Sequence, residues 1–239
     1  MKLRIDELLV LKKFAPTRSQ AKQLIKNGEV SYNQRKVSKP GQLVTADAEL
    51  VVGETLKYVS RGAYKLEAAI QAFKIDPKGK IVADVGASTG GFSDYLLQHA
   101  AEKIYCIDVG TDQLHPKLKS DPRIVNIEKT NIRTLVELPE KTDFAVVDLS
   151  YISLRLALPN IAKLTKGPII ALIKPQFEAG PGVVGSDGVI KDPLLIKKII
   201  EEFKNWCTEN SFKIEKIIPS PITGKVGNQE SLALISQQH

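Results

Sequence analysis

The sequence predicts an α/β fold, with helices on both faces of a mostly parallel sheet, preceded by a small α+β module. Three observations support this prediction. From residue 62 onward, short apolar runs alternate with segments of helical periodicity. A loop rich in small residues, 86–91, joins the first apolar run to a helical segment. An acid, Asp108, ends the next apolar run, where a Rossmann-like sheet presents a carboxylate to ribose hydroxyls.

The composition is that of a globular protein with one or two domains. The chain has 239 residues, 43% of them hydrophobic, and no apolar run approaches the ~20 residues that cross a bilayer. Its first residues are charged, unlike a secretory signal. Two cysteines, Cys106 and Cys207, are too few for a disulfide framework and lack the spacing of a zinc site. We therefore expect a cytoplasmic protein without a bound metal or a membrane partner.

The positive charge is concentrated near the amino terminus. The chain carries a formal charge of +7, and residues 1–60 hold 11 basic and 6 acidic residues. Clustered basic side chains are typical of a module that contacts a phosphate backbone, although solvated lysines are also common on ordinary surfaces.

The amino-terminal module has the order helix, helix, small sheet. Helical spacing covers residues 6–14 and 19–26, with a break at Pro16 and a left-handed stop at Asn27-Gly28. Alternating residues then predict short strands from 29 to 52, with a turn at 33–36.

This module resembles the S4-like RNA-binding domain. The matching stretches are 3–9, 17–25, 28–33 and 39–52, and Gln34 departs from the glycine that usually follows the asparagine. The resemblance implies a domain at 1–59, ahead of a second domain at 60–239. It also implies phosphate contacts from seven basic residues, which are Arg4, Arg18, Lys22, Lys26, Arg35, Lys36 and Lys39.

The second domain is predicted as an alternation of strands and helices. Strands are expected near 81–85, 103–107, 124–127, 143–147, 168–173, 213–218 and 231–235. Helices are expected near 62–74, 91–99, 112–119, 152–164 and 192–208. The last two strands have no helix between them, so they should form an antiparallel hairpin.

The predicted strands end in unusually polar residues. Asp84, Asp108, Asn131, Asp148 and Lys174 lie at or just beyond the ends of successive strands. Ligands of open α/β sheets bind at this edge. Because isolated buried charges are costly, an acid and a lysine there either form a structural ion pair or contact a ligand.

Four residues of the second domain resemble the Lys-Asp-Lys-Glu tetrad of FtsJ-like ribose 2′-O-methyltransferases. They are Lys65, Asp148, Lys174 and Glu230, in the stretches 61–67, 146–150, 172–178 and 227–231. Together with the amino-terminal module, the chain is similar to the TlyA family, also called hemolysin A, over nearly its whole length. The resemblance implies a class I methyltransferase sheet that uses S-adenosylmethionine to methylate ribosomal RNA. The uncharged stretch 181–184 departs from the family pattern, which bears on substrate choice.

The chemistry of the reaction agrees with these residue types. A ribose hydroxyl is a poor nucleophile at neutral pH, so it needs a base or an orienting group in line with the sulfonium methyl. We expect Lys174 to be that group, Asp148 and Lys65 to position it, and Glu230 to hold the set together.

The cofactor is expected along the first strand ends. Backbone amides of residues 86–90 would face the methionine carboxylate, Asp84 the ammonium, Asp108 the ribose and Asn131 the adenine. The predicted cofactor residues are Asp84, Gly86, Ala87, Ser88, Thr89, Gly90, Gly91, Asp108, Asn131 and Asp148. The glycine spacing does not fit the GxGxxG pattern of dinucleotide-binding proteins.

Two other functions remain open at this stage. The stretch 86–90 also spells the GxSxG elbow of serine hydrolases, with Ser88 as nucleophile, although only His99, His115 and His239 could complete a triad. Alternatively, the chain is a non-catalytic RNA-binding or hemolysin-type protein with a vestigial methyltransferase fold. The sequence shows no long amphipathic or membrane-spanning segment for lysis.

Overall fold

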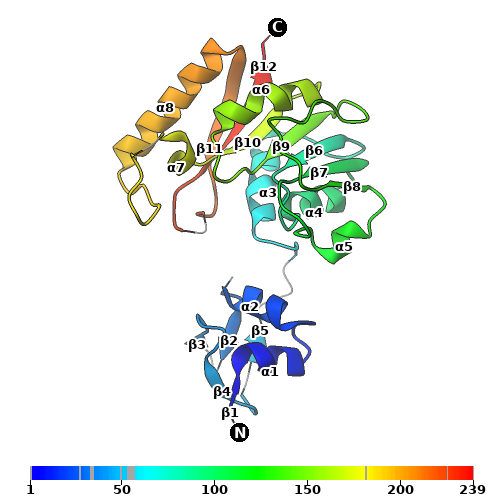
Figure 1. Cartoon of the computed structure of the whole chain (residues 1–239), viewed down its shortest axis with the longest axis vertical. Helices are drawn as coiled ribbons and strands as arrows, with labels where there is room; N and C mark the ends of the chain where they lie inside the picture. The colour runs from blue at the N-terminus through cyan, green and yellow to red at the C-terminus, as the bar shows by residue number, and fades with distance from the viewer. Residues whose placement is uncertain are drawn as a thin grey trace. The chain divides into compact units, whose positions relative to one another are not determined.

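The computed structural model divides into two compact units, Met1–Lys57 and Tyr58–His239 (Figure 1). It describes residues 2–26, 28–32, 35–48, 50–52, 57–180, 182–224 and 226–238, without the side chains of Arg35 and Lys36. The linker stretch 53–56 and the turn at 33–34 lie outside the described residues. A domain boundary at residues 59 and 60 therefore stays a prediction, and the two units are described separately.

The smaller unit packs two helices against short strands. Its elements are β1 (Lys2–Arg4), α1 (Ile5–Leu11), α2 (Arg18–Lys26), β2 (Val30–Tyr32), β3 (Arg35–Lys36), β4 (Leu43–Thr45) and β5 (Leu50–Val52). One sheet pairs β1 with β4, and the other has the order β3-β2-β5. Apolar side chains of both helices and of the strands form one core, which includes Ile5, Leu8, Leu9, Ala21, Ile25 and Val30.

The first helix is shorter than its periodicity predicts. It ends at Leu11 instead of residue 14, because Lys13 adopts a left-handed conformation with φ of 62°. Gly28 is also left-handed and follows α2, as the predicted stop requires.

The larger unit is built on a seven-stranded sheet with the order β11-β12-β10-β9-β6-β7-β8. Its strands are β6 (Ile81–Val85), β7 (Lys103–Ile107), β8 (Ile124–Ile127), β9 (Phe144–Val147), β10 (Ile169–Ile173), β11 (Phe212–Pro219) and β12 (Ser231–Gln237). Its helices are α3 (Gly62–Phe73), α4 (Gly91–Gln98), α5 (Pro116–Lys119), α6 (Leu154–Leu164), α7 (Pro175–Glu178) and α8 (Pro193–Glu209).

Five neighbouring strands of the sheet, β10, β9, β6, β7 and β8, are parallel. Strand β12 runs antiparallel to both β10 and β11. The predicted closing hairpin is thus confirmed, with β12 inserted between β10 and β11. This insertion brings the residue that precedes β12 beside the residue that follows β10.

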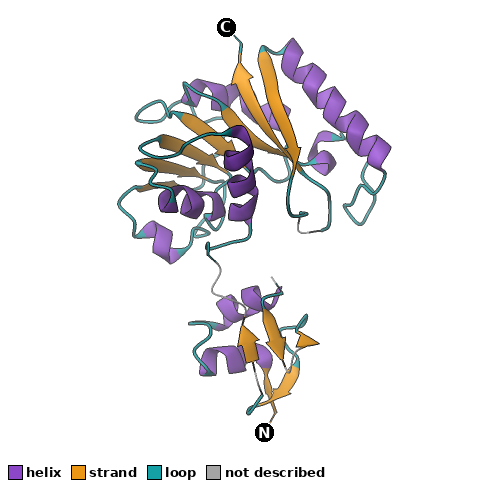
Figure 2. Ribbon diagram, turned by 180° about the vertical axis from the view of Figure 1, so that it is seen from behind, coloured by secondary structure: helices purple, strands orange, loops and turns teal. Residues whose placement is uncertain are grey.

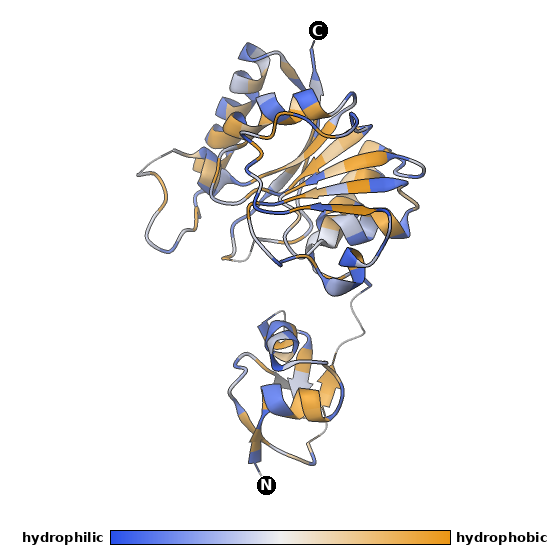
Figure 3. Ribbon diagram, turned by 45° about the vertical axis from the view of Figure 1, so that its right-hand side comes forward, coloured by the Kyte–Doolittle hydropathy of each residue, from blue (hydrophilic) through white to orange (hydrophobic). Residues whose placement is uncertain are grey.

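Helices cover both faces of this sheet (Figure 2). Side chains of α3 and α4 pack on one face, and those of α6 and α8 pack on the other. Apart from Lys103 at the start of β7 and Asp84 near the end of β6, the central strands are apolar (Figure 3), as expected for a sheet buried on both sides. Within the described residues, no helix is long and apolar enough to cross a bilayer.

Two helices of the larger unit differ from the prediction, one in its length and one in its presence. The helix expected at 112–119 is only α5, because Asp112 is left-handed and Pro116 takes the first helical position, where its missing N–H costs nothing. The short helix α7 was not predicted, since four residues are too few to show a periodicity.

Candidate active site

The polar residues that end the parallel strands meet at one edge of the sheet. Asp108 follows β7, Asp148 follows β9 and Lys174 follows β10, while Asp84 lies within the last two residues of β6. Because β6, β7, β9 and β10 are parallel, their carboxyl ends share this edge.

The four tetrad residues form two ion pairs. Lys65 Nζ lies 2.6 Å from Glu230 Oε2 and donates a hydrogen bond to it. Lys174 Nζ lies 2.6 Å from Asp148 Oδ1, at an angle outside hydrogen-bond geometry, and donates instead to Ser150 Oγ at 2.9 Å. Lys65, Lys174 and Glu230 are all buried, so each ammonium needs the charge of its partner.

The strand register explains why the two pairs are neighbours. Ile173 of β10 is the Cα partner of Ser231 of β12, and this is the last pair of their ladder at this end. Lys174 and Glu230 are the next residues beyond it. One strand pairing therefore links Lys174, which binds Asp148, with Glu230, which binds Lys65.

Asp84 is a buried carboxyl group with one unused oxygen. Its Oδ2 accepts a hydrogen bond of 2.6 Å from Ser93 Oγ, whereas no described residue donates to Oδ1. Burial, together with the nearby carboxylate of Asp148, raises the pKa of Asp84 to about 7. A buried acceptor without a donor is suited to a positively charged ligand group.

Most backbone amides of the loop 86–90 already donate hydrogen bonds within the protein. Gly86 N and Ala87 N donate to Ile107 O, Gly90 N donates to Ala87 O, and Ser88 N donates to Asp108 Oδ2 at 2.8 Å. Four of the amides predicted to face a ligand carboxylate therefore have acceptors within the protein, and their contact with a ligand stays a prediction. A loop this tight satisfies its donors locally, which the glycine pattern alone did not show.

Asp108 and Asn131 are also engaged by the backbone. Asp108 accepts hydrogen bonds from Ser88 N and Gly110 N, one on each carboxylate oxygen. Asn131 is exposed, and its side-chain oxygen accepts the N–H of Arg133. Both residues lie just beyond strand ends, where the sequence placed them.

Gly86 brings the loop against the end of β9. Its φ is +84°, and a Cβ at this position would lie 2.6 Å from the backbone oxygen of Asp148. Only glycine allows this contact, which places the loop directly beside the Asp148 backbone.

Glu178 is a buried residue to which the sequence assigned no role. Its carboxylate accepts hydrogen bonds from Ser153 Oγ at 2.6 Å and from Leu154 N at 2.7 Å, and burial raises its pKa. It lies on α7, which begins directly after Lys174. Glu178 and Lys174 therefore tie α7 to the two ends of the loop 148–154.

The Phe177 ring lies between Lys174 and an exposed aromatic residue in a chain of contacts. Tyr151 is 92% exposed, has a left-handed φ of 66°, and contacts the ring of Phe177 at a centroid distance of 5.4 Å. Lys174 Nζ lies 5.9 Å from the same Phe177 ring. Bulky residues rarely adopt this backbone conformation, and strained residues of this kind are enriched at functional sites.

The serine hydrolase alternative finds no triad in the described residues. The His99 ring stacks on Tyr95, and His115 Nδ1 accepts the N–H of Lys117. His239 lies outside the described residues. Neither described histidine has a hydrogen bond to Ser88.

The predicted RNA-binding residues lie in the smaller unit. Arg4 is on β1, three of them are on α2, and Lys39 lies between β3 and β4; the three on α2 are Arg18, Lys22 and Lys26. Arg35 and Lys36 form β3, and their side chains lie outside the described residues.

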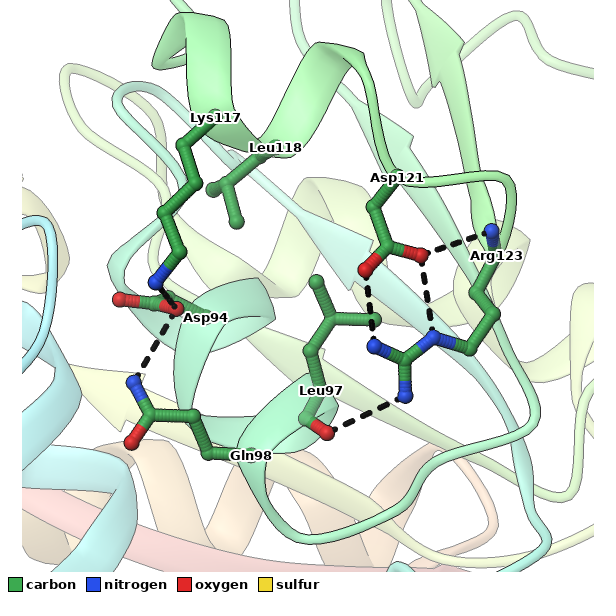
Figure 4. Close-up of a pocket in the computed structure, with 7 residues that line it drawn as sticks. All are labelled: Asp94, Leu97, Gln98, Lys117, Leu118, Asp121 and Arg123. Carbon is green, nitrogen blue, oxygen red and sulfur yellow. Dashed lines mark hydrogen bonds and ion pairs between the residues drawn. The ribbon is translucent and has the colours of Figure 1, made fainter.

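A cavity whose lining includes none of the strand-end residues lies elsewhere in the larger unit. It measures about 250 Å³ between α4 and α5 (Figure 4), and its lining consists of Asp94, Leu97, Gln98, Lys117, Leu118, Asp121 and Arg123. Its charged groups pair with one another, Lys117 with Asp94 and Arg123 with Asp121. Among the described residues, no group of three or more metal-binding side chains is present.

The sheet and its strand-end acids define the class as a Rossmann-like methyltransferase fold. A magnesium protoporphyrin IX methyltransferase from Synechocystis, solved with bound SAH, shares this fold at a TM-score of 0.51 and 14% identity, over 74% of this chain and 83% of its own. Residues 58–236 match the FtsJ-like methyltransferase family, and residues 3–50 match the S4 domain. The chain belongs to the FtsJ-like methyltransferase family, in its TlyA and hemolysin A branch.

Relatives of similar length support this assignment. The 16S/23S rRNA (cytidine-2′-O)-methyltransferase TlyA of Mycobacterium tuberculosis is 38% identical over 95% of this chain and 87% of its own. Hemolysin A of Brachyspira hyodysenteriae is 38% identical over 97% of this chain and 98% of its own. A solved hemolysin-like protein from Streptococcus thermophilus has a TM-score of 0.78 and 38% identity, over 99% of this chain and 89% of its own.

Proposed function

We propose that this chain transfers the methyl group of S-adenosylmethionine to a ribose 2′-hydroxyl of ribosomal RNA. The observation that carries the proposal is the pair of buried lysine–carboxylate contacts at the carboxyl edge of the sheet, Lys174 with Asp148 and Lys65 with Glu230. The relatives named as rRNA methyltransferases support the same reaction and substrate. Ribosomal subunits as substrate would place the protein in the cytoplasm.

The residues at this edge fit the cofactor. The unused Oδ1 of Asp84 is a buried acceptor for the ammonium group of the cofactor. Asp108 retains lone pairs for ribose hydroxyls, since each of its oxygens accepts one backbone N–H. Asn131 is the proposed contact for the adenine, and Gly86 lets the loop approach the Asp148 backbone. When bound, the cofactor supplies an electrophilic methyl on a sulfonium.

Lys174 is the proposed group that orients the ribose hydroxyl and receives its proton. As the oxygen–methyl bond forms and the sulfur–methyl bond breaks, the hydroxyl must lose one proton. Lys174 must reach this step as a neutral amine in order to take the hydroxyl proton, and the carboxylate of Asp148, 2.6 Å away, balances the charge of the ammonium that results. Ser150 fixes the amine from a second direction.

The smaller unit is proposed to hold the RNA through its basic side chains. In the larger unit, the exposed ring of Tyr151 offers a face on which an unstacked base can stack, which is how proteins commonly hold single-stranded bases. Phe177 supports this ring from the side of α7.

The test is methyl transfer from labelled S-adenosylmethionine to isolated 30S and 50S subunits that lack the modification. We expect Lys174→Ala to lower turnover by about 100-fold or more, since positioned acid–base groups contribute roughly 10²–10⁴. The cofactor Kd, measured by calorimetry, should change less than about threefold. Lys163→Ala, at an exposed position on α6, is the matched control. Unchanged turnover in Lys174→Ala, or no transfer by the wild type to either subunit, contradicts the proposal.

A further inference from the structure

A buried acid lies beneath two of the predicted RNA-binding arginines. Asp6, on the first turn of α1, is completely buried. Arg4 binds it with two hydrogen bonds, Nε to Oδ1 at 3.0 Å and Nη2 to Oδ2 at 3.1 Å. Arg18 Nη2, from α2, donates to the same Oδ2 at 3.3 Å. One carboxylate therefore holds guanidinium groups from two separate elements.

Both guanidinium groups remain accessible above this carboxylate. The side chains of Arg4 and Arg18 are 42% and 49% exposed. Arg4 uses only two of its five N–H donors on Asp6. The Arg4 guanidinium lies over Gly41, where a Cβ would come within 3.2 Å of Nη1, so the absence of a side chain there leaves room for the group.

We infer that Asp6 is a positioning residue that holds Arg4 and Arg18 side by side as a phosphate-binding pair. The inference rests on the proposed RNA-binding function of this unit and adds to it the residue that organises the contact. Guanidinium groups bind phosphate best as pre-oriented forks. Free arginine side chains lose conformational entropy on binding, and the contacts with Asp6 remove much of that loss beforehand.

This role makes a prediction opposite in sign to simple electrostatics. Removing a negative charge from a basic surface should tighten binding to a polyanion. If Asp6 instead orients the two arginines, Asp6→Asn should weaken RNA binding, although the net charge of the unit becomes more positive.

The experiment measures binding of the full chain to isolated 30S and 50S subunits across a range of salt. We expect Asp6→Asn to weaken binding about tenfold and to reduce the slope of log K against log salt by about 1. Glu7→Gln is the matched control, because Glu7 is next in sequence and contacts Arg18 Nη1 at 3.1 Å, but is itself 38% exposed. It should bind as the wild type does, or more tightly.

Arg4→Lys provides a second measurement that does not remove the buried acid. It keeps the charge but loses the bidentate contact, so we expect binding about threefold weaker or worse. If circular dichroism shows that Asp6→Asn unfolds the smaller unit, the binding of Arg4→Lys decides whether the arginines must be oriented. If Asp6→Asn with a folded unit binds as tightly as the wild type or more tightly, the inference about Asp6 is overturned. The same holds if Arg4→Lys does so. Neither result affects the proposed RNA-binding function. A wild type that binds neither subunit overturns the proposed RNA-binding function as well.

Discussion

The buried pair of Lys65 and Glu230 allows stability and function to be separated by mutation. Lys65 is 8% exposed and Glu230 is 2% exposed, with 2.6 Å between their charged atoms. Lys65→Met leaves the Glu230 carboxylate buried without its cation, and breaking such a pair costs about 3–5 kcal/mol. In the double variant Lys65→Met with Glu230→Gln, neither charge of the pair remains, so we expect most of this loss to be recovered.

The assay is unfolding in urea, monitored by the fluorescence of tryptophan. The single tryptophan, Trp206, packs between Phe203 and Phe212 in the larger unit, so its emission reports the unfolding of that unit. The midpoint should fall in Lys65→Met and return toward the wild-type value in the double variant, at a constant m-value. Methyl transfer should be lost in both variants.

Two results would refute this reasoning. A single variant as stable as the wild type would show that the pair is not desolvated as its burial indicates. A double variant that regains methyl transfer along with stability would show that the two charges serve the fold only.

Three further predictions follow from other parts of the site. The affinity for S-adenosylmethionine should fall as the pH drops below about 7, by up to about tenfold per pH unit, because protonated Asp84 no longer attracts an ammonium group. Calorimetry from pH 5.5 to 7.5 should show this trend in the wild type and not in Asp84→Asn. Glu178→Gln should cost about 1–3 kcal/mol in urea unfolding, because a neutral amide replaces the charged acceptor of the bonds from Ser153 and Leu154, and transfer should drop more than cofactor affinity. Gly86→Ala should destabilise the protein by at least about 1 kcal/mol more than Gly79→Ala. Both glycines are left-handed, but only a Cβ at Gly86 meets a neighbour, so equal losses would contradict the close approach.

Local patterns in the sequence located most of the elements and the polar residues at the ends of the parallel strands. Apolar runs of four to six residues and helical spacing located the strands and most helices of the larger unit, because burial on both faces of a sheet leaves a clear periodic signal. Polar residues at strand ends were equally visible, since parallel strands bring their carboxyl ends together whatever the loops do. The four-residue helix α7 and the three-residue strand β1 gave no such signal.

Only the tertiary structure decided which charges pair and which donors are already used. Lys65 and Glu230 are 165 residues apart in the chain, and they meet because β12 inserts next to β10. The use of Asp108 by the Ser88 amide and of Asp6 by two arginines likewise depends on contacts between separate elements. Periodicity reports the environment of each residue along its own helix or strand, whereas a hydrogen-bond partner is fixed by the packing of distant segments.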